Sequence, residues 1–123
     1  MHYLLSVQHR ISPTGDYQLS VPDHVSTDDL FTAVAALNAD LATQGAWVFA
    51  GGLQAPSEGC VVDASGPEVL VTDDPDTRTN EFLGGFWVID TTDRETALDW
   101  ARRASAAVRQ EIHVRPFQTA TEA

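Results

Sequence analysis

Two segments of the sequence carry apolar residues on one side of a helical repeat, and strand-forming residues flank both of them. The stripe of the first segment, residues 26–44, consists of Leu30, Val34, Leu37 and Leu41. The stripe of the second consists of Ala97, Ala101, Ala104 and Val108, widened by Leu98 and Trp100. A helix with one apolar face must bury that face against another element. The pattern therefore predicts two helices that cover one face of a sheet.

The residues at the ends of these segments are typical helix signals. Ser26 or Thr27 can cap the first helix, and Gly45 ends it because glycine readily adopts a left-handed backbone. Thr92 and Glu95 have the spacing of a capping box, so we expect the second helix to begin at Thr92.

Several short runs have the composition of β-strands. They are residues 2–9, 46–50, 60–62, 69–71, 86–90 and 112–115. The third and fourth runs flank a turn at 64–67 and predict a hairpin. The order is thus β-α-β, a hairpin, and β-α-β. It predicts an α+β fold, namely a ferredoxin-like βαβ-hairpin-βαβ subunit with an antiparallel sheet.

The second face of this sheet is predicted to carry large apolar groups too, and a single subunit has no further element to cover them. Exposed apolar patches promote association. We therefore expect a symmetric homodimer in which two sheets face each other. The chain is expected to form one domain, residues 1–118, followed by a frayed tail at 119–123.

Charge and residue usage exclude several functions. The 123 residues include 7 basic residues, all of them arginine, and 18 acidic ones, for a net charge of −11. A chain without lysine cannot form a lysine Schiff base, anchor pyridoxal phosphate or supply the lysine of a P-loop. The acidity argues against nucleic acid or an anionic membrane as a partner. The sequence also lacks a dinucleotide-binding motif, and we expect no cofactor.

Cys60 is the single cysteine, which excludes an internal disulfide and a multi-cysteine metal cluster. It is either a nucleophile or, as we favour, a small apolar residue of a strand, because thiolate activation requires a nearby base. The first residues lack the basic segment and long apolar run of a signal peptide, and no stretch is long enough to span a membrane. We expect a cytoplasmic protein.

From Val71 the sequence reads VTDDPDTRTNEFLGGFWVID. This stretch resembles the DGPF branch of the YCII-related proteins, whose signature runs roughly TDGPFxExKExLGGF. The positions that match it without gaps are Thr72, Asp73, Pro75, Glu81, Leu83, Gly84, Gly85 and Phe86. Residues 97–101 and 114–117 are similar to the family's second helix and closing VRPF strand. The resemblance implies a dimeric α/β barrel of ferredoxin-like subunits.

The loop within this signature departs from the family. Asp74, Asp76, Arg78 and Asn80 replace its glycine, phenylalanine, acidic residue and lysine, respectively. An activity that depends on those four groups is therefore not implied for this chain.

The acidic loop is the first candidate site. Asp73, Asp74 and Asp76 could offer oxygen ligands to a divalent cation, or one carboxyl could have a raised pKa and act as an acid or base. The alternative, which we favour, is that Asp73 stabilises a turn beside Pro75 while the other carboxylates are solvated. We therefore assign no metal site.

The closing strand is the second candidate. Period-two alternation places Glu111, His113 and Arg115 on one face and Ile112 and Val114 on the other. If the apolar pair packs under the helices, His113 and Arg115 face the dimer cavity. There the arginine could bind a carboxylate and the histidine could move a proton. An interfacial ion-pair network at the same residues is an equal alternative.

His9 is a weaker candidate, at the end of the first strand on the same side as Val7. It either contributes to a ligand site or, as we favour, is a partly exposed strand-end residue.

Three functions stay open at this point. The first is a homodimer that binds a small, anionic molecule between its sheets at His113, Arg115, His9 and the Asp73–Asp74 loop. The second is an enzyme that uses His113 or Asp73 as an acid or base in that pocket. The third is a structural or regulatory dimer without a ligand. Folds of this kind support unrelated chemistries, so the fold does not decide between them.

Overall fold

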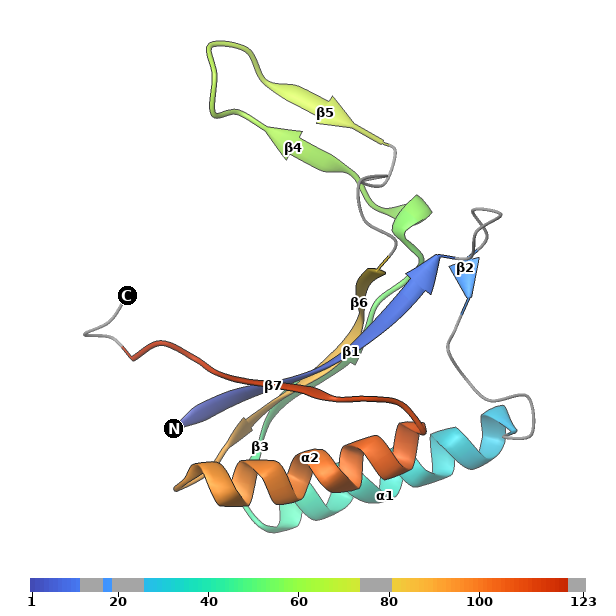
Figure 1. The fold of residues 1–123 in the computed structure, drawn as a ribbon, viewed down its shortest axis with the longest axis vertical. Coiled ribbons are helices and arrows are strands. Elements are labelled where there is room, and N and C mark those ends of the chain that lie inside the picture. Colours follow the sequence, from blue (N-terminus) through green and yellow to red (C-terminus); the bar gives the residue numbers. More distant parts are fainter. Residues whose placement is uncertain (12–16, 19–25, 74–80, 120–123) are drawn as a thin grey trace.

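Both predicted helices are present in the computed structural model, which describes residues 1–11, 17–18, 26–73 and 81–119. Helix α1 spans Thr27–Thr43 and helix α2 spans Arg94–Val108. The two helices contact each other and cover one face of the sheet (Figure 1). The chain thus has the α+β fold that its helix and strand pattern predicts.

An antiparallel sheet forms the other layer. Its five strands are β1 (His2–Ile11), β2 (Tyr17–Gln18), β3 (Trp47–Gly52), β6 (Glu81–Asp90) and β7 (His113–Pro116). On one side β1 pairs with β6, which pairs with β3; on its other side β1 pairs with β7 and β2. Leaving out β2, the order is β7-β1-β6-β3. This order agrees with the ferredoxin-like arrangement expected from the sequence.

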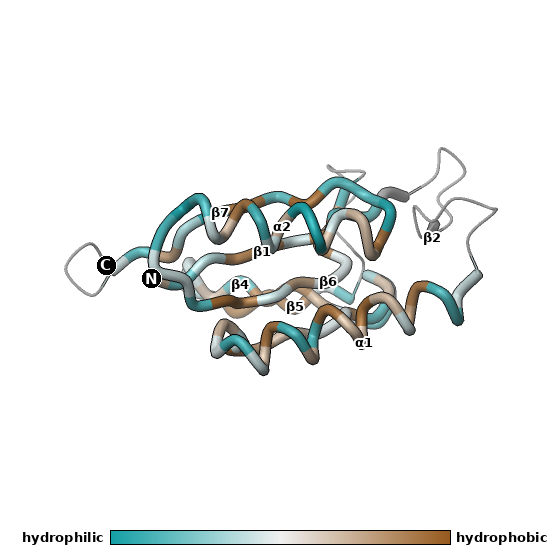
Figure 2. Tube along the Cα trace, turned by 90° about the horizontal axis from the view of Figure 1, so that it is seen from below, coloured by the Kyte–Doolittle hydropathy of each residue, from teal (hydrophilic) through white to brown (hydrophobic). Residues whose placement is uncertain are grey.

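The predicted hairpin is present, but it forms a sheet of its own. Strands β4 (Val61–Asp63) and β5 (Leu70–Thr72) pair with each other after a short 3-10 turn at Pro56–Glu58. Figure 1 and Figure 2 show the hairpin on the side of the main sheet that faces away from the helices. We call residues 60–73 the arm.

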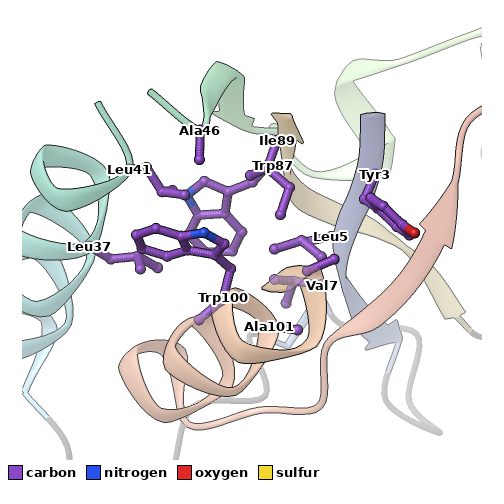
Figure 3. Close-up of a cluster of buried hydrophobic side chains, with 12 residues drawn as sticks. Tyr3, Leu5, Val7, Leu37, Leu41, Ala46, Trp87, Ile89, Trp100 and Ala101 are labelled. Atoms are coloured by element: carbon purple, nitrogen blue, oxygen red, sulfur yellow. The ribbon is translucent and has the colours of Figure 1, made fainter. Parts of the chain in front are cut away.

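The core lies between the helices and the main sheet. It consists of the buried side chains of Tyr3, Leu5, Val7, Leu37, Leu41, Ala46, Trp87, Ile89, Ala97, Trp100, Ala101 and Ala104. Both predicted apolar stripes thus face the sheet, and Figure 3 shows the indoles of Trp87 and Trp100 directed into this layer. The indole N–H of Trp87 donates to Oδ1 of Asn38 on α1 at 2.7 Å, which satisfies the polar atom of a buried ring.

The helix ends confirm one expected cap and correct the other. The Ser26 hydroxyl accepts the backbone N–H of Asp29 at 3.1 Å, and Gly45 after α1 has a φ of +73°. The second helix does not begin with a Thr92 cap. Its cap is Asp93, whose carboxylate accepts the backbone N–H of Thr96 at 2.8 Å. Hydrogen bonding with the side chain of Thr96, and then with its backbone N–H, lowers the pKa of that carboxyl. The cap therefore lies one residue later than predicted, at Asp93 instead of Thr92.

Three strands of the main sheet, β1, β3 and β6, are longer than predicted. The predicted run 46–50 stops before Gly51, but both Gly51 and Gly52 belong to β3. Strand β6 begins at Glu81 instead of Phe86, and β1 continues past residue 9 to Ile11. Glycines contribute no side-chain pattern, yet their backbones pair, Gly51 with Phe86 and Gly52 with Gly85. The expectation that Cys60 is an apolar residue within a strand is also wrong, because Cys60 is exposed and lies directly before β4.

Candidate functional site

The helices leave one face of the main sheet uncovered, and we call it the open face. Tyr3, Leu5 and Val7 of β1 face the helices, so the residues between them lie on the open face. Directly opposed residues of antiparallel strands share a face. The register therefore assigns the following residues to the open face: Leu4, Ser6, Phe49, Phe86, Val88, His113 and Arg115.

His113 and Arg115 lie together at the β7 edge of the open face. His113 is opposite Ser6 of β1 and Arg115 is opposite Leu4. Ile112 and Val114 pack against the core, as the alternation predicts, and both polar side chains are exposed. Arg115 makes no ion pair with any described residue, including Glu111. Its guanidinium is therefore available to a ligand or to another chain.

The β3 side of the open face is aromatic instead of charged. The rings of Phe49 and Phe86 are 5.8 Å apart between centroids and tilted by 44°. Phe49 is exposed, while Phe86 is half-buried. The open face thus has a cationic edge at β7 and an apolar edge at β3. A molecule with an anionic group and an apolar body fits this distribution of side chains.

The structure does not bring Asp73 to this site within one subunit. Asp73 is exposed at the end of the arm, directly after β5, whereas His113 and Arg115 lie on β7, well apart from it in Figure 1. Asp74 and the remaining acidic loop fall outside the described residues. The predicted ligand set of His113, Arg115 and the acidic loop is therefore assembled only in part.

His9 is buried, contrary to our preference for a partly exposed strand-end residue. Its exposed fraction is 7%. The imidazole meets the ring of Phe82 edge-on, with centroids 5.9 Å apart. It also lies over Gly84, where a Cβ atom would be 2.2 Å from Nδ1 of His9. The ring thus occupies space that any other residue at position 84 would need.

The burial of His9 gives the protein a pH-dependent stability. Removal from water lowers the pKa of its imidazole below the usual 6.5, because burial disfavours the charged form. Between that lowered pKa and 6.5 the unfolded chain binds more protons than the folded one. The free energy of unfolding contributed by His9 therefore falls as the pH falls through this interval and is fully retained above 6.5.

We expect the variant His9→Gln to lose this part of the pH dependence. Urea unfolding of the wild type and the variant at pH 7.5 to 5 should show a shallower loss of stability in the variant. Near-UV circular dichroism at pH 7.5 checks that the variant keeps its tryptophan core. Equal pH slopes for the two proteins would contradict the burial argument.

A model of the YCII-related domain matches residues 15–118. The chain belongs to the YCII-related family. A search of curated proteins found no match to this chain.

In this YCII-related domain, Gly84 and Gly85 are each required for a separate physical reason. Gly84 must lack a side chain because the His9 ring fills its place. Gly85 faces the β3 backbone, where a Cβ atom would lie 3.2 Å from the carbonyl oxygen of Gly51. A register shift between Val7 and Gln8 lets β1 continue along β6 past this point. The glycines therefore permit close packing at the centre of the sheet.

The match to the YCII-related domain begins after β1, although β1 is the strand that joins β6 to β7. The folded unit thus includes residues before the matched range. The family departures Asp74, Asp76, Arg78 and Asn80 all lie outside the described residues, so their arrangement is not part of the site described above.

Sequence reasoning missed the aromatic edge of the site. Phe49 and Phe86 are far apart in the sequence, and the pattern around each of them gives no reason to pair them. Alternation within each strand could have placed both on the open face, but only the β3–β6 register brings them together. Ser6, buried between Phe86 and His113 on the neighbouring strands, was missed for the same reason.

The part of the chain that the structure describes contains neither a cluster of metal-ligating side chains nor a helix able to span a membrane. Among the described residues, no three His, Cys, Asp or Glu side chains gather in an arrangement that could hold a metal ion. Neither α1 nor α2 combines the length and apolar character needed to cross a membrane.

Proposed function

We propose that this YCII-related protein is a homodimer that binds a small anionic molecule between the open faces of its two subunits. The assembly would be a dimeric α/β barrel of ferredoxin-like subunits. The observation that carries the binding proposal is Arg115, an exposed guanidinium that makes no ion pair with any described residue and lies beside His113 on an otherwise largely apolar face.

The exposed apolar groups support the dimer. Phe49 of β3 is 58% exposed beside the half-buried Phe86, and Leu53, which follows β3, is 48% exposed. Single exposed apolar residues are ordinary, but a contiguous group of this kind marks an interaction surface. A second open face placed over the first would remove these side chains from water and enclose His113 and Arg115 of both copies.

The charge of the chain supports an anionic ligand at Arg115. With a net charge of −11, the surface as a whole repels anions, so anion binding requires a specific cationic group. Arg102 and Arg103 are already paired with Asp99 and Asp40 on the helical layer. Arg115 instead lies where the sheet would be shielded from solvent by the second copy, and its planar fork suits a carboxylate or phosphate.

The replacement Arg115→Gln tests the proposal. We expect at least about a tenfold increase in the dissociation constant of the anion, since a hydrogen bond to a charged group contributes about 1.5–3 kcal/mol. Calorimetric titration with acetate, succinate, citrate and inorganic phosphate measures it, and the wild type should bind at least one of them.

Arg94→Gln is the matched control for this titration. It removes the same charge from the first turn of α2, on the layer that faces away from the proposed pocket. Its affinity should equal that of the wild type. Equal weakening in the two variants would mean that overall charge, not a site at Arg115, governs binding, and the proposal would fail.

A further inference from the structure

The arm has an apolar surface that its own subunit does not cover. Five large apolar side chains on it are exposed, namely Val61 (46%), Val62 (62%), Val69 (67%), Leu70 (58%) and Val71 (61%). Three residue pairs hold its strands together: Val61 with Thr72, Val62 with Val71 and Asp63 with Leu70. A two-stranded hairpin of this size is marginally stable alone in water, so such an arm is expected to pack against another surface.

The two faces of the arm differ in polarity. Val62 and Val71 are directly opposed and form an apolar cross-strand pair on one face. The other face mixes Val61 and Leu70 with the polar side chains of Asp63 and Thr72. The face of Val62 and Val71 is therefore the one suited to burial, while the mixed face is suited to partial contact with water.

The position of the arm favours a second copy of the chain as its partner. The arm projects on the side of the main sheet opposite the helices, which is the side of the open face (Figure 1). A subunit placed on the open face would therefore stand beside the arm. In a twofold dimer the same relation holds in both directions, so each arm would reach the other subunit.

The area available for burial points to the same partner. Phe49 and Leu53, two exposed apolar side chains on and after β3, offer on the order of 100 Å² each, whereas a stable homodimer buries roughly 1,000 Å² per subunit, about 65% of it apolar. The Val62–Val71 face of the arm adds further exposed apolar side chains of on the order of 100 Å² each and brings the buried area closer to that of a stable dimer. The open face alone falls short of it.

We propose that each arm packs its Val62–Val71 face on the second subunit of the dimer, so that the interface and the pocket it encloses are completed by the partner's arm. This inference rests on the homodimer proposed above. It assigns to the hairpin a role in assembly that the sheet faces alone do not fulfil.

The double variant Val62→Thr/Val71→Thr tests the proposal. Threonine keeps the shape and strand preference of valine but replaces one methyl group with a hydroxyl. Four such replacements per dimer should raise its dissociation constant about 100-fold, measured by sedimentation equilibrium. Val61→Thr, the same change on the mixed face, should raise it less than about threefold. Near-UV circular dichroism of Trp87 and Trp100 checks folding.

The outcomes separate this inference from the proposed function. If the wild type is dimeric and the double variant dimerises as tightly, the arm does not form the interface, and the dimer and its anion site still stand. If the double variant instead loses folding stability while association is unchanged, the arm packs on its own subunit, and the inference is wrong. A wild type that stays monomeric at millimolar concentration overturns the dimer and the arm contact together.

Discussion

Replacing Ile89 by alanine is expected to lower the free energy of unfolding by about 2–5 kcal/mol, the range found when a large aliphatic side chain is truncated in a core. Ile89 is completely buried. It lies in β6, directly opposite Tyr3 of β1 and Trp47 of β3, and so belongs to the middle of the sheet (Figure 3). The strands on both sides of Ile89 are held in place by pairing, so the cavity that the alanine leaves cannot easily collapse.

Urea unfolding of Ile89→Ala, followed by tryptophan fluorescence, measures this loss. Phe31→Ala is the control, because Phe31 on α1 is a larger apolar residue that is 69% exposed. Truncation there should change the free energy of unfolding by no more than about 0.5 kcal/mol. A loss at Phe31 comparable with that at Ile89 would mean that the helical layer packs differently from the arrangement described.

The variant Gly84→Ala is expected to lower the free energy of unfolding by about 1–3 kcal/mol, the usual cost of overpacking a close contact. The added methyl group would lie within 2.6 Å of three ring atoms of His9. That ring is buried and meets Phe82, so it cannot turn into solvent without opening the packing around it.

A double-mutant cycle with His9→Ala isolates the cause. Removing the imidazole creates space for the methyl group, so Gly84→Ala should cost much less in the His9→Ala background. Gly66→Ala is the matched control, since Gly66 in the arm turn has no atom within 4 Å of a built Cβ. Additive losses in the cycle would show that the steric contact with His9 is not what requires glycine at position 84.

The helices were predictable because several independent local signals agree. The first helix has its apolar stripe, its Ser26 cap and its Gly45 end at consistent positions, and the observed bounds differ by one residue. The start of the second was misplaced because Thr92 and Asp93 are both good caps. Only the backbone geometry, which directs the Asp93 carboxylate to the N–H of Thr96, decides between them.

The strands show what local pattern leaves undetermined. The alternation of residues 60–72 correctly predicted a hairpin, but it contains no information on whether the hairpin joins the main sheet. Alternation did predict that His113 and Arg115 lie on one face of the closing segment and Ile112 and Val114 on the other, as observed. The burial of His9 could not be predicted, because it depends on Gly84 of a strand that lies far along the chain.

Strand β1 is translated before β6 and β7, yet these two strands, about 80 to 110 residues further along the sequence, form most of its pairing in the sheet. Tyr3, for example, pairs with both Ile89 and Pro116. At ribosomal speeds of about 5–20 residues per second, β1 waits for seconds before these partners exist. Contacts this distant also slow folding, because the chain entropy of a long loop is lost before the pairing is gained. The nascent chain is therefore expected to need protection of Leu5 and Val7 until β6 and β7 have been synthesised.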